Sequence, residues 1–62
     1  MTVYIEGIGK ITASKSALNT LALIAHEAAF SYNKRGLHAL ADEANRATCT
    51  IYNELNAKGH YK

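Results

Sequence analysis

Two long stretches of this chain repeat apolar side chains at alternating spacings of three and four residues, which is the period of one face of an α-helix. The first stretch covers residues 14–33 and the second covers residues 37–57. The apolar seam of the first consists of Leu18, Leu21, Ala25, Ala28 and Tyr32, and that of the second of Leu37, Leu40, Ala44, Ala47, Ile51 and Leu55. The sequence therefore predicts two amphipathic helices.

The first stretch carries residues that start and stop helices. Ser14 or Ser16 can serve as the N-cap, because a serine hydroxyl accepts a hydrogen bond from one of the first free amides. Lys34 and Arg35 suit the negative end of the helix dipole, and Gly36 suits the left-handed turn that ends a helix. Because the connection is short, we expect the two helices to form an antiparallel hairpin.

Residues 1–13 lack the helical period. Apolar and aromatic side chains surround two glycines there: Val3, Tyr4, Ile5, Ile8 and Ile11. This pattern predicts a short strand or a two-stranded β-hairpin. An isolated hairpin is marginal in water, so it must lie against the helices, pair with its copy in a dimer or stay loose. With residues 58–62 as a frayed tail, the expected fold is mainly α, in a single domain over residues 1–62.

A chain of 62 residues is short for an unassisted fold. A domain of this size buries only about 60% of the surface that its unfolded form exposes, so its stability is marginal. Cys49 is the only cysteine, which excludes an intramolecular disulfide and suits a reducing compartment. The three histidines are too scattered for a zinc site, and no cofactor is expected. Self-association is the remaining way to stabilise so short a chain, and we therefore expect a homodimer.

Leu23 and Phe30 point to the surface through which two copies would meet. They lie on the side of the first helix opposite Leu21, because each residue advances by about 100°. A small monomer gains little by leaving a large aromatic side chain in water. Either the N-terminal hairpin folds over these side chains, or they pack against a second copy to form a four-helix core. His26 flanks them, and a histidine at an interface would make association depend on pH.

A polar stripe follows the outer face of the second helix: His38, Asp42, Asn45, Cys49, Asn53 and Asn56. A histidine and a cysteine on one helix raise the possibility of an activated nucleophile, whose base must lie within hydrogen-bonding reach. His38 and Cys49 are eleven residues apart in sequence, which is about 16 Å along a helix. We therefore expect no enzyme activity, and a stripe that is solvated or faces a partner.

The charged residues do not favour a nucleic acid or a membrane as partner. The net charge of +2 comes from seven basic and five acidic residues that are spread along the chain. Electrostatic binding to nucleic acid needs clustered Lys and Arg. No apolar run is long enough to span a bilayer, and the first residues do not have the pattern of a signal peptide. The expectation is a soluble, cytoplasmic protein.

Residues 40–52 resemble the helix-turn-helix of TetR-like repressors, in which a Leu-Ala-x-x-Ala pattern precedes a turn and a Thr-Leu-Tyr pattern follows it. The resemblance implies a DNA-binding regulator whose recognition helix covers residues 48–56. Arg46 replaces the apolar turn residue of that family, and residues 48–56 contain no Lys or Arg to face phosphates. DNA binding is thus the alternative function. A turn at residues 45–47 would support it, and a continuous helix would oppose it.

In its length and its helical stretch from residue 16 to residue 58, the whole chain also resembles the short accessory proteins encoded in the early region of lambda-like phages. That resemblance implies a modulator of host takeover or of the choice between lysis and lysogeny, acting in the host cytoplasm. It carries over no functional residue. The expected function is regulation by protein–protein interaction, with a host or phage protein as the partner.

Overall fold

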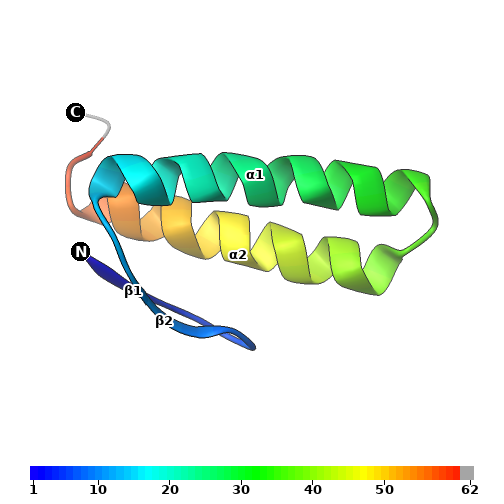
Figure 1. Cartoon of the computed structure of the whole chain (residues 1–62), viewed down its shortest axis with the longest axis horizontal. Coiled ribbons are helices and arrows are strands. Elements are labelled where there is room, and N and C mark those ends of the chain that lie inside the picture. The colour runs from blue at the N-terminus through cyan, green and yellow to red at the C-terminus, as the bar shows by residue number, and fades with distance from the viewer. Residues whose placement is uncertain (61–62) are drawn as a thin grey trace.

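The computed structural model describes residues 1–60. They form two antiparallel strands, β1 (Thr2–Ile5) and β2 (Gly9–Thr12), followed by two helices, α1 (Lys15–Lys34) and α2 (His38–Ala57). The helices lie side by side and run in opposite directions, and the β-hairpin lies along one face of the pair (Figure 1). The predicted fold class, a mainly helical hairpin with an N-terminal β-segment, is confirmed.

Helix α1 begins at a serine and ends at a glycine turn. The Ser14 Oγ accepts a hydrogen bond of 3.1 Å from the amide of Ala17, which satisfies one of the free donors at the start of the helix. At the other end Gly36 adopts a φ of 76°, and the Leu37 amide donates to the Tyr32 carbonyl at 2.9 Å. This 6→1 hydrogen bond belongs to the Schellman motif, so local sequence defines both ends of α1.

Helix α2 is continuous from His38 to Ala57. Residues 45–47 are helical, so the chain has no turn at the position where a helix-turn-helix requires one. The helix starts one residue later than predicted, because Leu37 lies at the N-cap, where its apolar side chain makes no capping hydrogen bond. The sequence left open whether residues 45–47 form a turn or continue the helix, and they continue it.

Residues 58–60 form a hydrogen-bonded turn in place of the predicted frayed tail. Gly59 has a φ of 76°, and the amide of His60 donates to the Leu55 carbonyl at 3.0 Å. This turn repeats the Schellman motif and satisfies the last carbonyls of α2. Residues 61 and 62, which belong to the same predicted tail, lie outside the described residues.

The β-hairpin lies against the helices, which was one of the three arrangements left open by the sequence. Its strands pair in register from Thr2 opposite Thr12 to Ile5 opposite Gly9. Because side chains alternate between the two faces of a strand, Val3 and Ile5 point into the core while the residue between them is exposed. The hairpin therefore supplies one apolar face to the helical pair.

The core lies where the β-hairpin meets both helices, at Val3, Ile5, Leu18, Ala22, Ala47, Ile51 and Leu55. Thr48 is buried beside it, and its Oγ1 lies 2.9 Å from the Ala44 carbonyl oxygen and 3.3 Å from the Ala22 carbonyl oxygen of the facing helix. The small side chains at this contact allow the two helices to approach closely.

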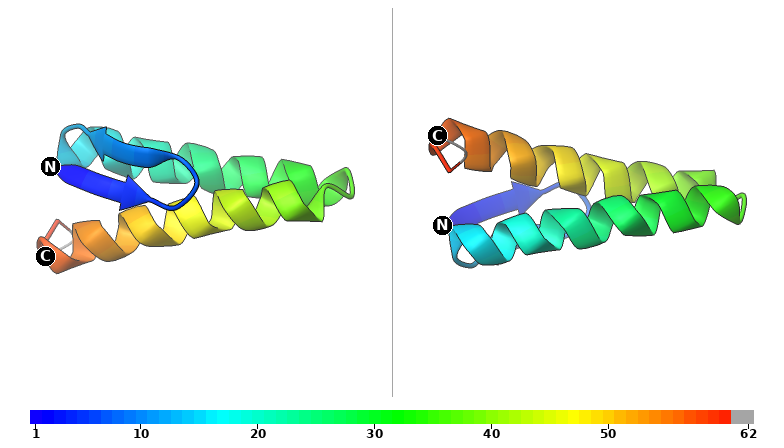
Figure 2. Two further views of the ribbon diagram at one scale, coloured as in Figure 1. Left: turned by 90° about the horizontal axis from the view of Figure 1, so that it is seen from below. Right: turned by 90° about the horizontal axis from the view of Figure 1, so that it is seen from above.

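The predicted seams are only partly buried. In α1 the buried residues are Leu18, which belongs to the predicted seam, and Ala22 and Ala29, which do not; the other four predicted seam residues are half-buried. In the seam predicted for the second helix, the first two residues, Leu37 and Leu40, are exposed by 41% and 43%. The β-hairpin explains the difference, since it reaches over only the part of the helical pair near the chain's N-terminus (Figure 2). The remaining seam positions face an open surface.

Candidate interaction surfaces

The predicted dimer face on α1, formed by Leu23, His26 and Phe30, is exposed. The exposed fraction is 49% for Leu23 and 63% for Phe30. The β-hairpin packs against a different part of α1, which includes Leu18 and Leu21. The arrangement in which the hairpin folds over Phe30 therefore does not occur. This predicted face is left available to a second molecule.

The ring of Phe30 is in contact with the basic side chain of Lys34. The Nζ of Lys34 lies 4.8 Å from the ring centroid, one turn further along the helix. An exposed cation–π contact of this kind is worth about 0.5–1 kcal/mol, less than burial of the ring would contribute. His26 is exposed on the same side of α1. The dimer face thus has an apolar centre with basic or titratable side chains at its edge.

All six residues of the polar stripe are exposed: His38, Asp42, Asn45, Cys49, Asn53 and Asn56. The Nδ1 of His38 forms a hydrogen bond of 2.9 Å with the Oδ1 of Asn33, which ties the start of α2 to the end of α1. Cys49 is a free thiol. Because α2 is continuous, the separation of about 16 Å between His38 and Cys49 stands, and the two cannot act as nucleophile and base.

Within residues 1–60, no three His, Cys, Asp or Glu side chains come close enough to hold a metal ion. Neither helix described there combines the length and apolarity needed to cross a membrane. In the same residues, every buried side-chain nitrogen or oxygen has a hydrogen-bond partner.

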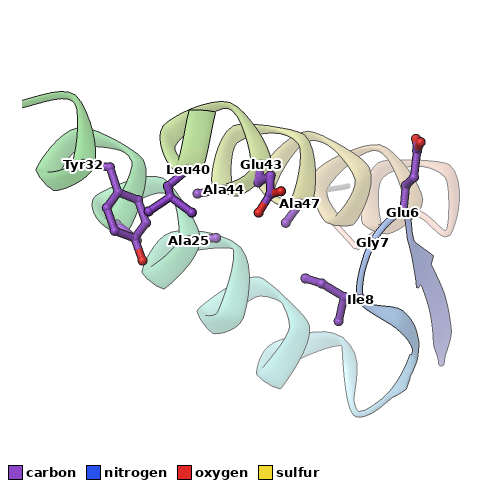
Figure 3. Close-up of a pocket in the computed structure, with 10 residues that line it drawn as sticks. Glu6, Gly7, Ile8, Ala25, Tyr32, Leu40, Glu43, Ala44 and Ala47 are labelled. Atoms are coloured by element: carbon purple, nitrogen blue, oxygen red, sulfur yellow. The ribbon is translucent and has the colours of Figure 1, made fainter. Parts of the chain in front are cut away.

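A groove between α1 and α2 was not predicted from the sequence. It has a volume of about 310 Å³, starts at the tip of the β-hairpin beside Ile8, and continues along the helical pair towards Tyr32 and Leu40 (Figure 3). Alanines from both helices line it: Ala25, Ala28, Ala44 and Ala47. We call this surface the α1–α2 groove. It lies on the face of the helical pair that also carries the hairpin.

The α1–α2 groove exists because the strands are much shorter than the helices. Each strand has four residues and spans about 13 Å, whereas each helix has twenty residues and spans about 30 Å. Beyond the hairpin, the alanine side chains are too short to fill the space between the helices. Two features of the sequence could have indicated the groove: the alanines in both seams and the short N-terminal segment.

The charged residues that line the α1–α2 groove are both acidic. Glu43 projects from α2 over the opening between the helices, and Glu6 stands on the hairpin tip at one end (Figure 3). At the opposite end, the guanidinium of Arg35 lies 5.2 Å from the centroid of the Tyr32 ring. Figure 3 shows the side chain of Glu6 pointing away from the alanines of the groove, so the negative charge over the opening is that of Glu43.

These surfaces differ in what they offer to another molecule. The dimer face offers an exposed aromatic ring, the polar stripe offers amides and a thiol, and the α1–α2 groove offers an apolar depression with acidic residues. Comparisons of the chain with protein-family models, with curated proteins and with solved structures found no match.

Proposed function

We propose that this chain is a non-enzymatic regulatory protein that acts by binding another protein, and that it works as a homodimer formed through the dimer face. The observation that carries the proposal is the exposure of Phe30 and Leu23 on one side of α1, at 63% and 49%. Exposed aromatic and aliphatic side chains that share one helix face are typical of protein contact surfaces. The resemblance to short phage accessory proteins supports a regulatory role in the host cytoplasm.

The gain from pairing two dimer faces is large enough to matter for so small a chain. Burying a fully exposed side chain of this size contributes about 1.5–3 kcal/mol. Since roughly half of each side chain is still exposed, the four side chains of a dimer contribute on the order of 3–6 kcal/mol. The whole stability of a domain is about 5–15 kcal/mol. Dimerisation would therefore be a substantial part of the stability of this chain.

The arrangement of the helices suits such a dimer. Leu23 and Phe30 are separated by two turns, so they form one stripe along α1. When two such stripes pack against each other about a two-fold axis, each contributes a helical hairpin and the product is a four-helix core. His26 and Lys34 would lie at the edge of this contact, where charged side chains remain in water.

Phe30→Asp tests the dimer. It places a carboxylate in the centre of the contact, and we expect the purified protein to become monomeric in multi-angle light scattering at concentrations where the unchanged chain is dimeric. Ile24→Asp is the matched control, because Ile24 is equally apolar, 60% exposed and on a different side of the same helix. A dimer that persists in Phe30→Asp with unchanged thermal stability would contradict the proposed interface.

DNA binding, the alternative from the sequence, has less support. It requires a turn at residues 45–47, where α2 is continuous. It also requires Lys or Arg side chains that face phosphates, and residues 48–56 contain neither. A gel-shift assay with mixed-sequence DNA at low salt distinguishes the two functions. A retarded band whose intensity falls as salt increases would favour the DNA-binding alternative over the protein partner.

A further inference from the structure

We propose that the α1–α2 groove is a docking site for a short amphipathic helix of a partner protein, about two turns long in its contact, with an apolar stripe and a Lys or Arg beside it. This inference deepens the proposed function, because it gives the chemistry of the partner. It uses a different face from the dimer. The shape of the groove, its length and its charge each support it.

The shape of the groove fits a helix. From Ala25 to Tyr32 the groove follows α1 for seven residues, which is about 10 Å or two turns. The alanines on its floor allow a third helix to approach to an axial distance of about 8 Å, the short end of the range for packed helices. A helix that docks in this way presents anchors at positions i, i+3 or i+4, and i+7. Two turns provide all of these anchors.

The length of the groove suits a short occupant. Ile8 on the hairpin tip is 66% exposed and Leu40 near the opposite end is 43% exposed, so each offers apolar surface to an anchor side chain. A second copy of this chain would present helices of twenty residues, about 30 Å long. Laid along the groove from the hairpin tip, such a helix would extend well past Leu40, whereas a helical segment of two or three turns would lie within the groove.

The charge of the groove indicates the charge of the partner. The chain has a net charge of +2, yet the charged residues that line the groove, Glu6 and Glu43, are acidic. Complementary charge steers association and fixes the register of a bound segment. The basic residue of the partner is therefore expected beside Glu43. It is not expected at the end where Arg35 stacks on Tyr32.

A fluorescein-labelled peptide provides the test. The probe is a fourteen-residue helical peptide with leucines at i, i+4 and i+7, alanines between them and lysines on both flanks, titrated with the full chain while fluorescence anisotropy is read. Ala44→Leu fills the floor of the groove, and we expect its affinity for the probe to fall at least roughly tenfold. Glu43→Lys replaces an attraction by a repulsion, for which we expect a loss of roughly fivefold.

Two matched controls separate the groove from general effects. Ala57→Leu makes the same change at an exposed alanine of α2 that does not line the groove. Glu27→Lys makes the same charge change on the outer side of α1. We expect both controls to bind the probe within about twofold of the unchanged chain. Absence of saturable binding, or equal losses in the controls, would overturn the proposal. Because Glu43 is exposed, Glu43→Lys keeps the test decisive if Ala44→Leu does not fold.

The same proteins distinguish this proposal from the dimer. Light scattering on Phe30→Asp reports the dimer, whereas anisotropy reports the groove. A monomeric Phe30→Asp that still binds the probe supports both proposals, and a dimeric one that binds the probe removes only the proposed dimer face. If Glu43→Lys and Ala44→Leu instead dissolve the dimer, the groove is an interface between copies of the chain, and the partner helix is rejected.

Discussion

At the scale of single residues, Thr48 joins the two helices through a buried polar contact. Its Oγ1 lies within hydrogen-bonding distance of carbonyl oxygens of Ala44 in its own helix and Ala22 in the facing helix. A buried hydroxyl without a partner would destabilise the fold, whereas one that is satisfied contributes about 1 kcal/mol. Thr48 therefore fixes the position of α2 along α1 in a contact that is otherwise made by small apolar side chains.

Thr48→Val is expected to lower the free energy of unfolding by about 0.5–1.5 kcal/mol, because it keeps the volume and removes the hydroxyl. Thr20→Val is the matched control, since the Thr20 hydroxyl donates to the Ser16 carbonyl within one exposed helix and reaches no other element. Urea unfolding followed by circular dichroism measures both variants. An equal effect in the two would show that the contact between helices contributes nothing.

Single residues also show which parts of the fold could be predicted from the sequence: the ends of the helices could, and the buried face of α1 could not. The ends of the helices were predictable to within about a residue at Ser14 and Gly36, because caps and glycine turns act through bonds to nearby backbone groups. The burial of Ala22 and Ala29 was not predicted. Alanine fits either face of a helix, so the side on which α2 packs is set by contacts between elements, which the spacing of apolar residues alone does not specify.

At the scale of elements, the β-hairpin acts as a third layer that is too short for the helices beneath it. Val3 and Ile5 close the core near the end of α2, while the α1–α2 groove stays open beyond the hairpin tip. The seam residues Leu37 and Leu40 match a buried pattern in sequence but lie past the reach of the strands. The groove was therefore unpredictable from periodicity, because it results from the relative lengths of elements that are far apart in the chain.

Ile5→Ala is expected to lower the free energy of unfolding by about 2–5 kcal/mol, since Ile5 is 2% exposed and its loss leaves a cavity under the hairpin. Tyr4→Ala changes the neighbouring residue of the same strand, which is 65% exposed, and should have an effect of at most about 0.5 kcal/mol. Thermal melting of both variants provides the measurement. Similar losses in the two would mean that the hairpin is not packed through Ile5.

At the scale of the whole molecule, the helical pair has different surfaces on its two sides. The described residues extend over 35 × 23 × 15 Å. The side with the hairpin carries the α1–α2 groove, and α1 presents Phe30 away from the hairpin. If both proposals hold, a dimer joined through Phe30 leaves its two grooves free. One dimer would then bind two copies of a partner helix.

The melting temperature of the chain is expected to rise by several degrees when its concentration is increased from about 5 µM to about 500 µM, because only the folded form would take part in the proposed dimer. Differential scanning fluorimetry and calorimetry cover this range. Phe30→Asp should remove the concentration dependence, and Ile24→Asp should keep it. A melting temperature of the unchanged chain that is the same at both concentrations would count against the dimer.

The short turn at Gly36 has a consequence for how the chain reaches this structure. It places α1 and α2 next to each other along the chain, so most of their contacts form by closing a small loop, and proteins rich in such local contacts fold within microseconds to milliseconds. The chain contains no proline, which removes the commonest slow isomerisation. If the proposed dimer forms, a refolding phase that lasts seconds would report the association of two chains, and its rate would rise with protein concentration.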